Sequence, residues 1–192
     1  MSESIIEQKA ALRARMRTEL QQLTRSQRED AAVEICARLV EQPAWRNART
    51  VLLFAPLTDE PNVRPLFHAA LAGGKLMALP RFNSGMDDYE AAIIRDLDKD
   101  CVEGRFGILE PATLCETVDL KRLDLILVPG LAFDWQGHRL GRGKGFYDRL
   151  LAEVSGKTCG VAFDQQLVSA IPVEPHDVHL NCILTPSHWL EL

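Results

Sequence analysis

Three cations and three glycines alternate within one short stretch of the sequence, RLGRGKG at residues 139–145. Glycine lets the backbone approach a ligand closely, and arginine and lysine side chains make charge-assisted hydrogen bonds to anions. Residues 146–154 follow with the spacing of an amphipathic helix, whose N-terminus would also attract negative charge. These residue types in this order predict an anion-binding loop, and the phosphates of a nucleotide are the anion that we expect.

The loop departs from two common phosphate-binding patterns. A Walker A loop, GxxxxGK[ST], would need glycine at His138 and serine or threonine at Gly145. The GxGxxG pattern would need glycine at Phe146. The alternative is a flexible basic loop on the surface, in which three glycines would cost conformational entropy without serving a function.

Two cations near the N-terminus are candidates for the same site. On a helical wheel of about 100° per residue, Lys9 falls inside the apolar stripe that includes Met16 and Leu20, and Arg13 falls at its edge. Either both cations turn inward toward a bound anion, or their aliphatic stems lie along the edge of the core while the charges reach water. The sequence leaves both possibilities open.

The spacing of apolar residues predicts the elements that position these side chains. We expect helices at residues 3–22, 24–42, 62–71 and 146–154. We expect strands at residues 50–55, 75–79, 89–94, 125–128, 158–163 and 181–184, and a loop-rich segment at 96–123. The second helix begins with a capping box, Thr24 and Gln27, and stops before Pro43.

Alternation of strands and helices is typical of an α/β fold. We predict one domain over residues 1–192, with a largely parallel or mixed sheet, helices on both of its faces and an N-terminal helical pair. Ligands gather at the carboxyl ends of the strands in such sheets. Those ends are residues 55–60, 80–81, 129–134 and 163–166, and the glycine-rich loop follows the third of them.

Composition limits the classes of partner. The 192 residues carry a net charge of −5, so a general nucleic-acid-binding surface is not expected. Five widely spaced cysteines without a metal-binding pattern indicate reduced thiols. The N-terminus lacks the apolar run of a signal peptide, and no segment approaches the roughly 18 apolar residues of a membrane span. We therefore expect a cytoplasmic monomer that acts on small molecules, with no nucleic-acid or membrane partner.

The loop and the strand before it resemble a known signature. RLGRGKGFYD, preceded by DLILVPGLAFD, is similar to the central motif of the 5-formyltetrahydrofolate cyclo-ligases, also called methenyltetrahydrofolate synthetases. Lys9 and Arg13, PLTDE at 56–60, GILEP at 107–111 and PVEPHD at 172–177 follow in family order, so the resemblance covers nearly the whole chain. It implies an enzyme that uses ATP and magnesium to close 5-formyltetrahydrofolate to 5,10-methenyltetrahydrofolate, releasing ADP and phosphate.

The resemblance also implies which residues form the site. ATP would contact Lys9, Ala10, Ala11, Leu12, Arg13, Arg139, Leu140, Gly141, Arg142, Gly143, Lys144, Gly145, Phe146 and Tyr147. The folate would contact Ala55, Glu60, Phe106, Arg142, Gly143, Lys144, Gly145 and Phe146, and Asp148 and Asp177 would serve magnesium. Arg142 and Lys144 would be the catalytic cations, because phosphoryl transfer depends on positioning and on positive charge at the transferring oxygens.

Two positions depart from the family pattern. Phe146 stands where many relatives carry tyrosine, and Phe106 stands where tryptophan is common. Phe146 lacks the hydroxyl that a tyrosine would offer, and Phe106 would stack less strongly on a pterin.

The sequence is also compatible with other roles for single residues and with other functions for the chain. Asp148 suits the first turn of a helix without any metal, and Glu60 could be a solvated turn residue rather than a partner of the substrate's amine or pterin nitrogens. A zinc site around Asp177 would lack a third ligand. A folate- or nucleotide-binding protein without turnover is a second function, but this chain keeps Lys144 and both aspartates. A sugar-phosphate isomerase or deaminase is a third, and it would leave the inward cations of the first helix unexplained.

Overall fold

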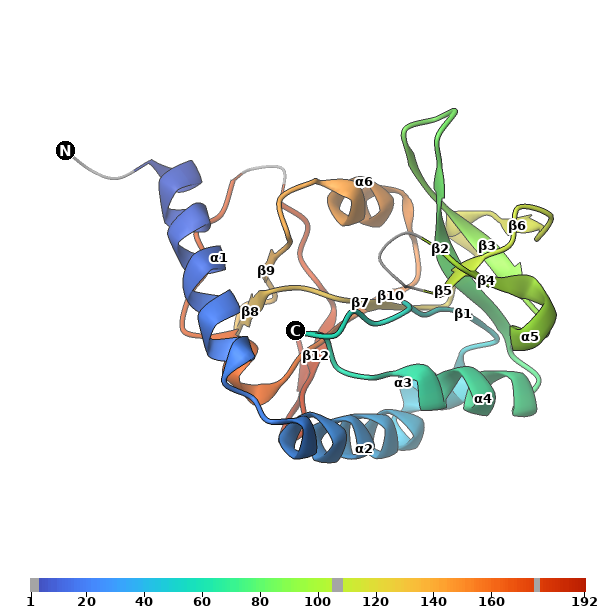
Figure 1. Ribbon diagram of the computed structural model, residues 1–192, viewed down its shortest axis with the longest axis horizontal. Coiled ribbons are helices and arrows are strands. Elements are labelled where there is room, and N and C mark those ends of the chain that lie inside the picture. Colours follow the sequence, from blue (N-terminus) through green and yellow to red (C-terminus); the bar gives the residue numbers. More distant parts are fainter. Residues whose placement is uncertain (1–3, 105–108, 175–176) are drawn as a thin grey trace.

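The computed structural model describes residues 4–104, 109–174 and 177–192. An eight-stranded sheet lies at its centre, in the order β13-β12-β10-β7-β1-β2-β3-β6 (Figure 1). The strands of this sheet are β1 (Thr50–Leu52), β2 (Leu76–Asn83), β3 (Asp88–Ile94), β6 (Thr117–Val118), β7 (Leu125–Val128), β10 (Lys157–Val161), β12 (Cys182–Leu184) and β13 (Trp189–Glu191). The helices are α1 (Ile5–Gln21), α2 (Arg25–Glu41), α3 (Pro43–Asn47), α4 (Arg64–Ala72), α5 (Leu97–Asp100) and α6 (Phe146–Glu153).

The middle of the sheet is parallel and its edges are antiparallel. β12, β10, β7, β1 and β2 pair in parallel, whereas β13, β3 and β6 join in antiparallel pairs. The chain starts in the middle at β1, moves outward to β2 and then returns to β7 on the other side of β1. The chain therefore leaves the carboxyl ends of β1 and β7 in opposite directions, which opens a crevice between them where ligands bind in such sheets.

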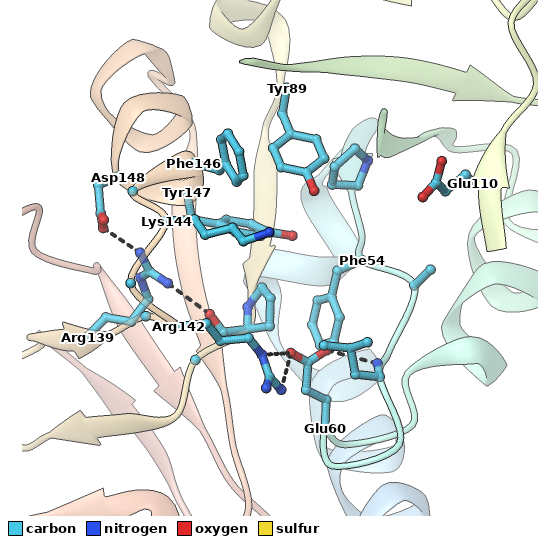
Figure 2. A pocket seen from close by; sticks show the side chains of 18 of the residues that line it. Phe54, Glu60, Tyr89, Glu110, Arg139, Arg142, Lys144, Phe146, Tyr147 and Asp148 are labelled. Carbon is cyan, nitrogen blue, oxygen red and sulfur yellow. Dashed lines mark hydrogen bonds and ion pairs between the residues drawn. The ribbon is translucent and has the colours of Figure 1, made fainter. Parts of the chain in front are cut away.

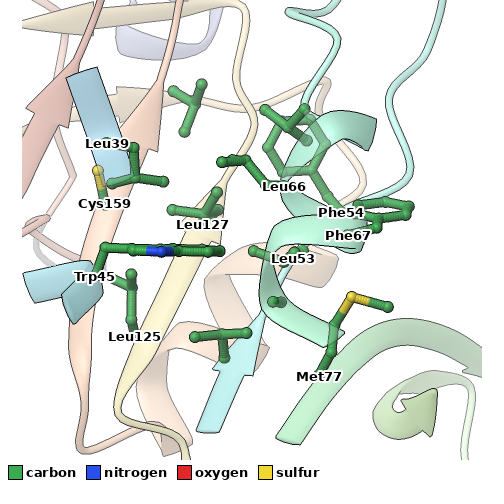
Figure 3. Packing of buried hydrophobic residues seen from close by; sticks show 14 of the residues in the cluster. Leu39, Trp45, Leu53, Phe54, Leu66, Phe67, Met77, Leu125, Leu127 and Cys159 are labelled. Carbon is green, nitrogen blue, oxygen red and sulfur yellow. The ribbon is translucent and has the colours of Figure 1, made fainter. Parts of the chain in front are cut away.

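Helices cover both faces, as the sequence predicts. Successive side chains of β1 point to opposite faces, so Val51 packs with the cluster under α2, α3 and α4, and Leu52 packs with the cluster under α6. Figure 3 shows the first cluster, in which Trp45 of α3 lies beside Leu125 and Leu127 of β7, and Phe67 of α4 lies beside Phe54. No helix in the described ranges is long and apolar enough to cross a membrane.

The first two helices form as predicted but pack on different partners. Both begin with a capping box, at Ser4–Glu7 and at Thr24–Gln27. α2 lies on the main sheet, whereas α1 buries Met16 and Leu20 against a separate small sheet (Figure 1). That sheet has the order β11-β8-β9 and consists of β8 (Ala132–Asp134), β9 (Arg139–Leu140) and β11 (Leu167–Val168).

The predicted end of the second strand is wrong. Pro80 does not end β2, which continues to Asn83 as a hairpin with β3. β1 pairs with β2 only as far as Ala78, so from there on one edge of β2 is open. Proline, which has no N–H to donate, is tolerated at such an edge.

Other predicted boundaries shift by a few residues. The ladder of β1 ends at Leu52 rather than at Ala55, and β10 ends at Val161 rather than at Phe163. Pro43 ends α2 as predicted but also begins α3. The loop-rich segment carries short elements, namely α5, β4 (Cys101–Glu103), β5 (Leu109–Pro111), β6 and the 3-10 helix η2 (Leu120–Arg122), and a second 3-10 helix, η3 (Asp164–Gln166), follows β10.

Candidate active site

A cavity of about 440 Å³ opens at the carboxyl ends of β1, β2 and β7 (Figure 2). It lies in the crevice where the strand order reverses. Its lining is Arg17, Phe54, Ala55, Leu57, Glu60, Pro80, Tyr89, Leu109, Glu110, Pro129, Gly130, Arg139, Gly141, Arg142, Gly143, Lys144, Gly145, Phe146, Tyr147 and Asp148. Most of the glycine-rich loop therefore forms one wall of the cavity.

The backbone of the loop depends on two of its glycines. Gly143 has φ of 100° and Gly145 has φ of 70°, a region that residues with a Cβ rarely adopt. Gly145 is also the N-cap of α6, where no side chain accepts a hydrogen bond from the first turn of the helix. The open N–H groups of that turn and the positive end of the helix face a loop that already carries cations, which suits a phosphate.

Arg139 is fixed at the base of the cavity rather than on a mobile loop. It belongs to β9, which pairs with β8, and its side chain is 5% exposed. Its guanidinium donates to the carbonyl oxygen of Pro129 at 3.2 Å, forms an ion pair with Asp148 and lies over the ring of Tyr147. These contacts join the end of β7 to the first turn of α6.

Arg142 is held by two carboxylates from the loop after β1. Its Nη2 lies 2.6 Å from Oδ1 of Asp59. The same Nη2 lies 3.0 Å from Oε1 of Glu60 (Figure 2). The other oxygen of Glu60 accepts a hydrogen bond from the N–H of Leu57 at 3.0 Å. Burial raises the pKa of Glu60, although the Leu57 N–H and the charge of Arg142 act in the opposite direction. Glu60 is therefore not a solvated turn residue, because it is buried and positions Arg142.

Lys144 differs from the other two loop cations. Within the part of the chain that the structure describes, its ammonium group forms no ion pair or hydrogen bond, and the residue is exposed. Figure 2 shows its side chain pointing into the cavity. A cation in this position can meet an incoming anion without first releasing a carboxylate.

Helix α1 approaches the loop from outside the cavity. Nε of Arg13 donates to the carbonyl oxygen of Gly141 at 3.0 Å, and its guanidinium lies beside Gly143. Lys9 is buried, and its ammonium lies 2.7 Å from Asp177 and 2.9 Å from Glu174. Burial lowers the pKa of Lys9, but these two carboxylates outweigh it and hold that pKa above the ordinary value.

Aromatic rings form the upper wall of the cavity. The ring of Phe146 meets Tyr89 edge to face at 5.1 Å between centroids and Phe82 at 5.5 Å. Arg149 lies over the outer face of Phe146. Burial raises the pKa of the neighbouring Tyr147, so its hydroxyl stays protonated near neutral pH. Phe146 is thus packed by its neighbours without needing a hydroxyl.

The structure brings together some of the predicted residues and separates others. Ala55, Glu60, Arg139, the loop from Gly141 to Tyr147, and Asp148 line the cavity. Residues outside the lining are Lys9, Ala10, Ala11, Leu12, Arg13, Leu140 and Asp177. Leu140 and Leu12 instead pack with the small sheet, and Ala10 and Ala11 are exposed. Phe106 lies outside the described residues.

Three lining residues escaped the sequence analysis. Arg17 lies one helical turn after Arg13, and this spacing places both side chains on the same side of α1. Tyr89 belongs to β3, which follows β2 beyond Pro80, and Glu110 belongs to β5 in a weakly patterned segment. The sequence offered two signals that were not carried through to a site role, namely the spacing of Arg13 and Arg17 and the position of Glu110 inside the GILEP motif.

The carboxylates around the cavity suit a metal ion only in part. Among the described residues, no group of three or more histidine, cysteine, aspartate or glutamate side chains could hold a metal ion. Asp148 lines the cavity, whereas Asp177 accepts a hydrogen bond from Lys9 outside it. A magnesium ion here would need most of its ligands from phosphate oxygens and water, which is its usual preference.

Comparison with known proteins identifies related chains. Residues 5–186 match the 5-formyltetrahydrofolate cyclo-ligase family. The 5-formyltetrahydrofolate cyclo-ligase of Escherichia coli is 32% identical over 86% of this chain and 93% of its own, and the mouse enzyme of that name is 27% identical over 92% of each chain. The solved structure of 5,10-methenyltetrahydrofolate synthetase from Aquifex aeolicus superposes with a TM-score of 0.87 at 30% identity, covering 96% of this chain and 92% of that one.

Proposed function

This chain belongs to the 5-formyltetrahydrofolate cyclo-ligase family, and from that premise we propose that it closes 5-formyltetrahydrofolate to 5,10-methenyltetrahydrofolate with ATP. The match over residues 5–186 supports the resemblance seen in the sequence and makes the chain a cyclo-ligase by family. The observation that carries the proposal is a single cavity with loop cations on one side and aromatic rings on the other. Such a cavity suits two substrates, one rich in phosphate and one with a flat ring system.

The cationic side of the cavity would hold the phosphates. Lys144 and Arg142 reach the cavity from the loop, and the first turn of α6 adds open N–H groups. Arg13 supports the loop by its hydrogen bond to Gly141. Lys9 and Asp177 would contribute indirectly, from outside the cavity, because their ion pair links α1 to the segment before β12.

The chemistry requires a better leaving group than a formamide oxygen. Phosphoryl transfer from ATP to the formyl oxygen would convert that oxygen into part of a phosphate leaving group. The N10 nitrogen would then attack the formyl carbon. N10 then gives up its proton to the phosphate, the carbon–oxygen bond breaks, and the phosphate departs. The contribution of Lys144 and Arg142 is to place positive charge on the oxygens that transfer and leave.

The buried Glu60 has a defined part in this proposal. Because both of its oxygens are occupied, one by Arg142 and one by the N–H of Leu57, it orients the guanidinium of Arg142 rather than moving a proton. Asp59 holds the same guanidinium from the more exposed side. Ala55, at the end of β1, would lie against the folate beside them.

We propose that Asp148 supplies the protein ligand to a magnesium ion, and that phosphate oxygens and water would complete the shell. The ion would neutralise charge on the phosphates. That Asp177 is a second carboxylate ligand of magnesium stays a prediction.

We further propose that residues 1–192 form one domain that acts as a cytoplasmic monomer.

An isotope experiment tests the proposed route. The substrate carries oxygen-18 in its formyl group, and the released phosphate is analysed by mass spectrometry. The proposal expects one labelled oxygen in each phosphate formed, with one ADP for each methenyltetrahydrofolate. Label released as water, with unlabelled phosphate, would contradict phosphorylation of the formyl oxygen.

A further inference from the structure

Glu110 is a carboxylate in the cavity to which the proposed reaction assigns no part. It lies on β5, half-buried, where it pairs with Val102 of β4. Its side chain lines the cavity together with Leu109. In Figure 2 it lies on the side of Tyr89 and Phe54 that is farther from Arg139 and Asp148. The cavity thus has cations at one end and a carboxylate at the other.

The backbone leaves room for this side chain. A Cβ added to Gly104, just after β4, would lie 2.2 Å from Cδ of Glu110 and 2.5 Å from its Oε2. Real Cβ atoms do not approach so closely, so any larger residue at position 104 would displace the carboxylate. The absence of a side chain at Gly104 therefore helps to fix where Glu110 points.

The described residues that line this end of the cavity with Glu110 are apolar or aromatic, namely Phe54, Pro80, Tyr89 and Leu109. Within residues 4–104, 109–174 and 177–192, no ion pair or side-chain hydrogen bond involves its carboxylate. Burial and the nearby charge of Glu110 together raise the pKa of Tyr89, which places the carboxylate close to that ring. As far as the described residues are concerned, both carboxylate oxygens are thus available as acceptors.

The other two carboxylates that line the cavity differ in this respect, because Asp148 pairs with Arg139 and Glu60 is held on both oxygens. One of its oxygens accepts from Arg142 and the other from the N–H of Leu57. A carboxylate needs two open oxygens to accept a parallel pair of N–H groups. Glu110 meets this requirement and Glu60 does not.

We propose that Glu110 determines specificity for the pterin, because its carboxylate accepts the adjacent ring N–H and amino N–H groups of the amino-pyrimidinone edge. This inference rests on the function proposed above. The flat ring lies against Tyr89, Phe54 and Pro80, which line the same end of the cavity. With that edge anchored at Glu110, the opposite side of the pterin, which carries the formyl group, faces the loop cations. The carboxylate thus sets the orientation in which the formyl oxygen meets the phosphate.

The test compares binding of two ligands without nucleotide, by isothermal titration calorimetry. One ligand is 5-formyltetrahydrofolate, and the other is its analogue with methyl in place of the 2-amino group. A bidentate contact to a charged group predicts that the wild type binds the natural ligand roughly 10- to 100-fold more tightly. Glu110→Gln, which keeps the size but loses the charge, is expected to reduce that preference to about threefold or less.

Two further variants separate the position of the carboxylate from its charge. Gly104→Ala keeps the charge but displaces the carboxylate, so it should lose the preference as Glu110→Gln does. Glu103→Gln removes an exposed carboxylate from the adjacent strand and should behave as the wild type. Circular dichroism confirms that each variant is folded.

The outcomes are distinguishable. A wild type that binds neither ligand and forms no methenyltetrahydrofolate overturns the proposed function and this inference with it. A wild type that cyclises its substrate but binds both ligands equally overturns the inference alone. An undiminished preference in both Glu110→Gln and Gly104→Ala also overturns it, while loss in both with retention in Glu103→Gln supports it.

Discussion

Replacement of Lys144 by alanine separates catalysis from folding more cleanly than any other change in the loop. Its side chain is exposed, points into the cavity and forms no ion pair or hydrogen bond with the described residues. Surface substitutions of this kind change the free energy of unfolding by about 0.5 kcal/mol or less. Arg142 and Arg139 are unsuitable for the purpose, because each is held by carboxylates that its removal would leave unpaired.

The expected kinetic effect is much larger than the effect on stability. Removal of one positioned group that stabilises developing charge costs roughly 100- to 1000-fold in kcat, or about 3 to 4 kcal/mol. Lys144→Ala should therefore lower the rate of methenyltetrahydrofolate formation by at least about 100-fold. Its thermal midpoint should stay within about 2 °C of the wild type, given that a chain of this size shifts by roughly 2–4 °C per kcal/mol.

The assay follows the absorbance of methenyltetrahydrofolate at saturating ATP and magnesium, and calorimetry gives the thermal midpoint. Lys121→Ala is the matched control, because Lys121 is an exposed lysine on η2 outside the cavity. Turnover of Lys144→Ala within a few-fold of the wild type would refute the phosphate role of this side chain. A large fall in the thermal midpoint would instead show that Lys144 has a structural role, contrary to its exposure.

Three further changes test other parts of the site and fold. Because burial raises the pKa of Glu60, the folded state binds its proton to higher pH than the unfolded state, so wild-type stability should fall as pH rises from about 4.5 through the raised pKa. The urea midpoint of Glu60→Gln should lack that fall. If the urea midpoint of the wild type instead rose relative to that of the variant with increasing pH, the pKa of Glu60 would not be raised. Asp148→Asn should raise the magnesium concentration for half-maximal activity about tenfold or more, whereas an unchanged requirement would exclude Asp148 as a ligand. Gly156→Ala would place a Cβ 2.0 Å from the carbonyl oxygen of Leu123, so overpacking of about 1–3 kcal/mol should lower the thermal midpoint by roughly 2–12 °C. An unchanged midpoint would show that the backbone moves aside at little cost.

The sequence predicts those parts of the fold that depend on interactions between residues close together in the chain. The capping box of α2 at Thr24 and Gln27, the buried strand β7 and the helix after the glycine-rich loop all lie where their patterns place them. The glycine-rich loop also lies beside the carboxyl end of β7, as predicted, while its binding of an anion stays a prediction. Each of these features depends on residues within a few positions of one another.

The missed features depend on distant residues. Pro80 ends a strand in most contexts, but here β1 stops at Leu52 and opens one edge of β2 to the proline. Arg142 and Glu60 lie 82 positions apart, so no local pattern could show that the cation is held by that carboxylate. The inward position of Lys9 was one of two possibilities, and its carboxylate partners lie at the other end of the chain.

In the proposed function, this cavity couples ring closure of the folate to the consumption of ATP. Its most direct test is the absorbance assay on the purified wild-type chain, with 5-formyltetrahydrofolate and magnesium, in the presence and absence of ATP. We expect methenyltetrahydrofolate only when ATP is present, with one ADP formed for each molecule of product. Product formed at the same rate without nucleotide, or no product formed with ATP, would contradict the proposed coupling.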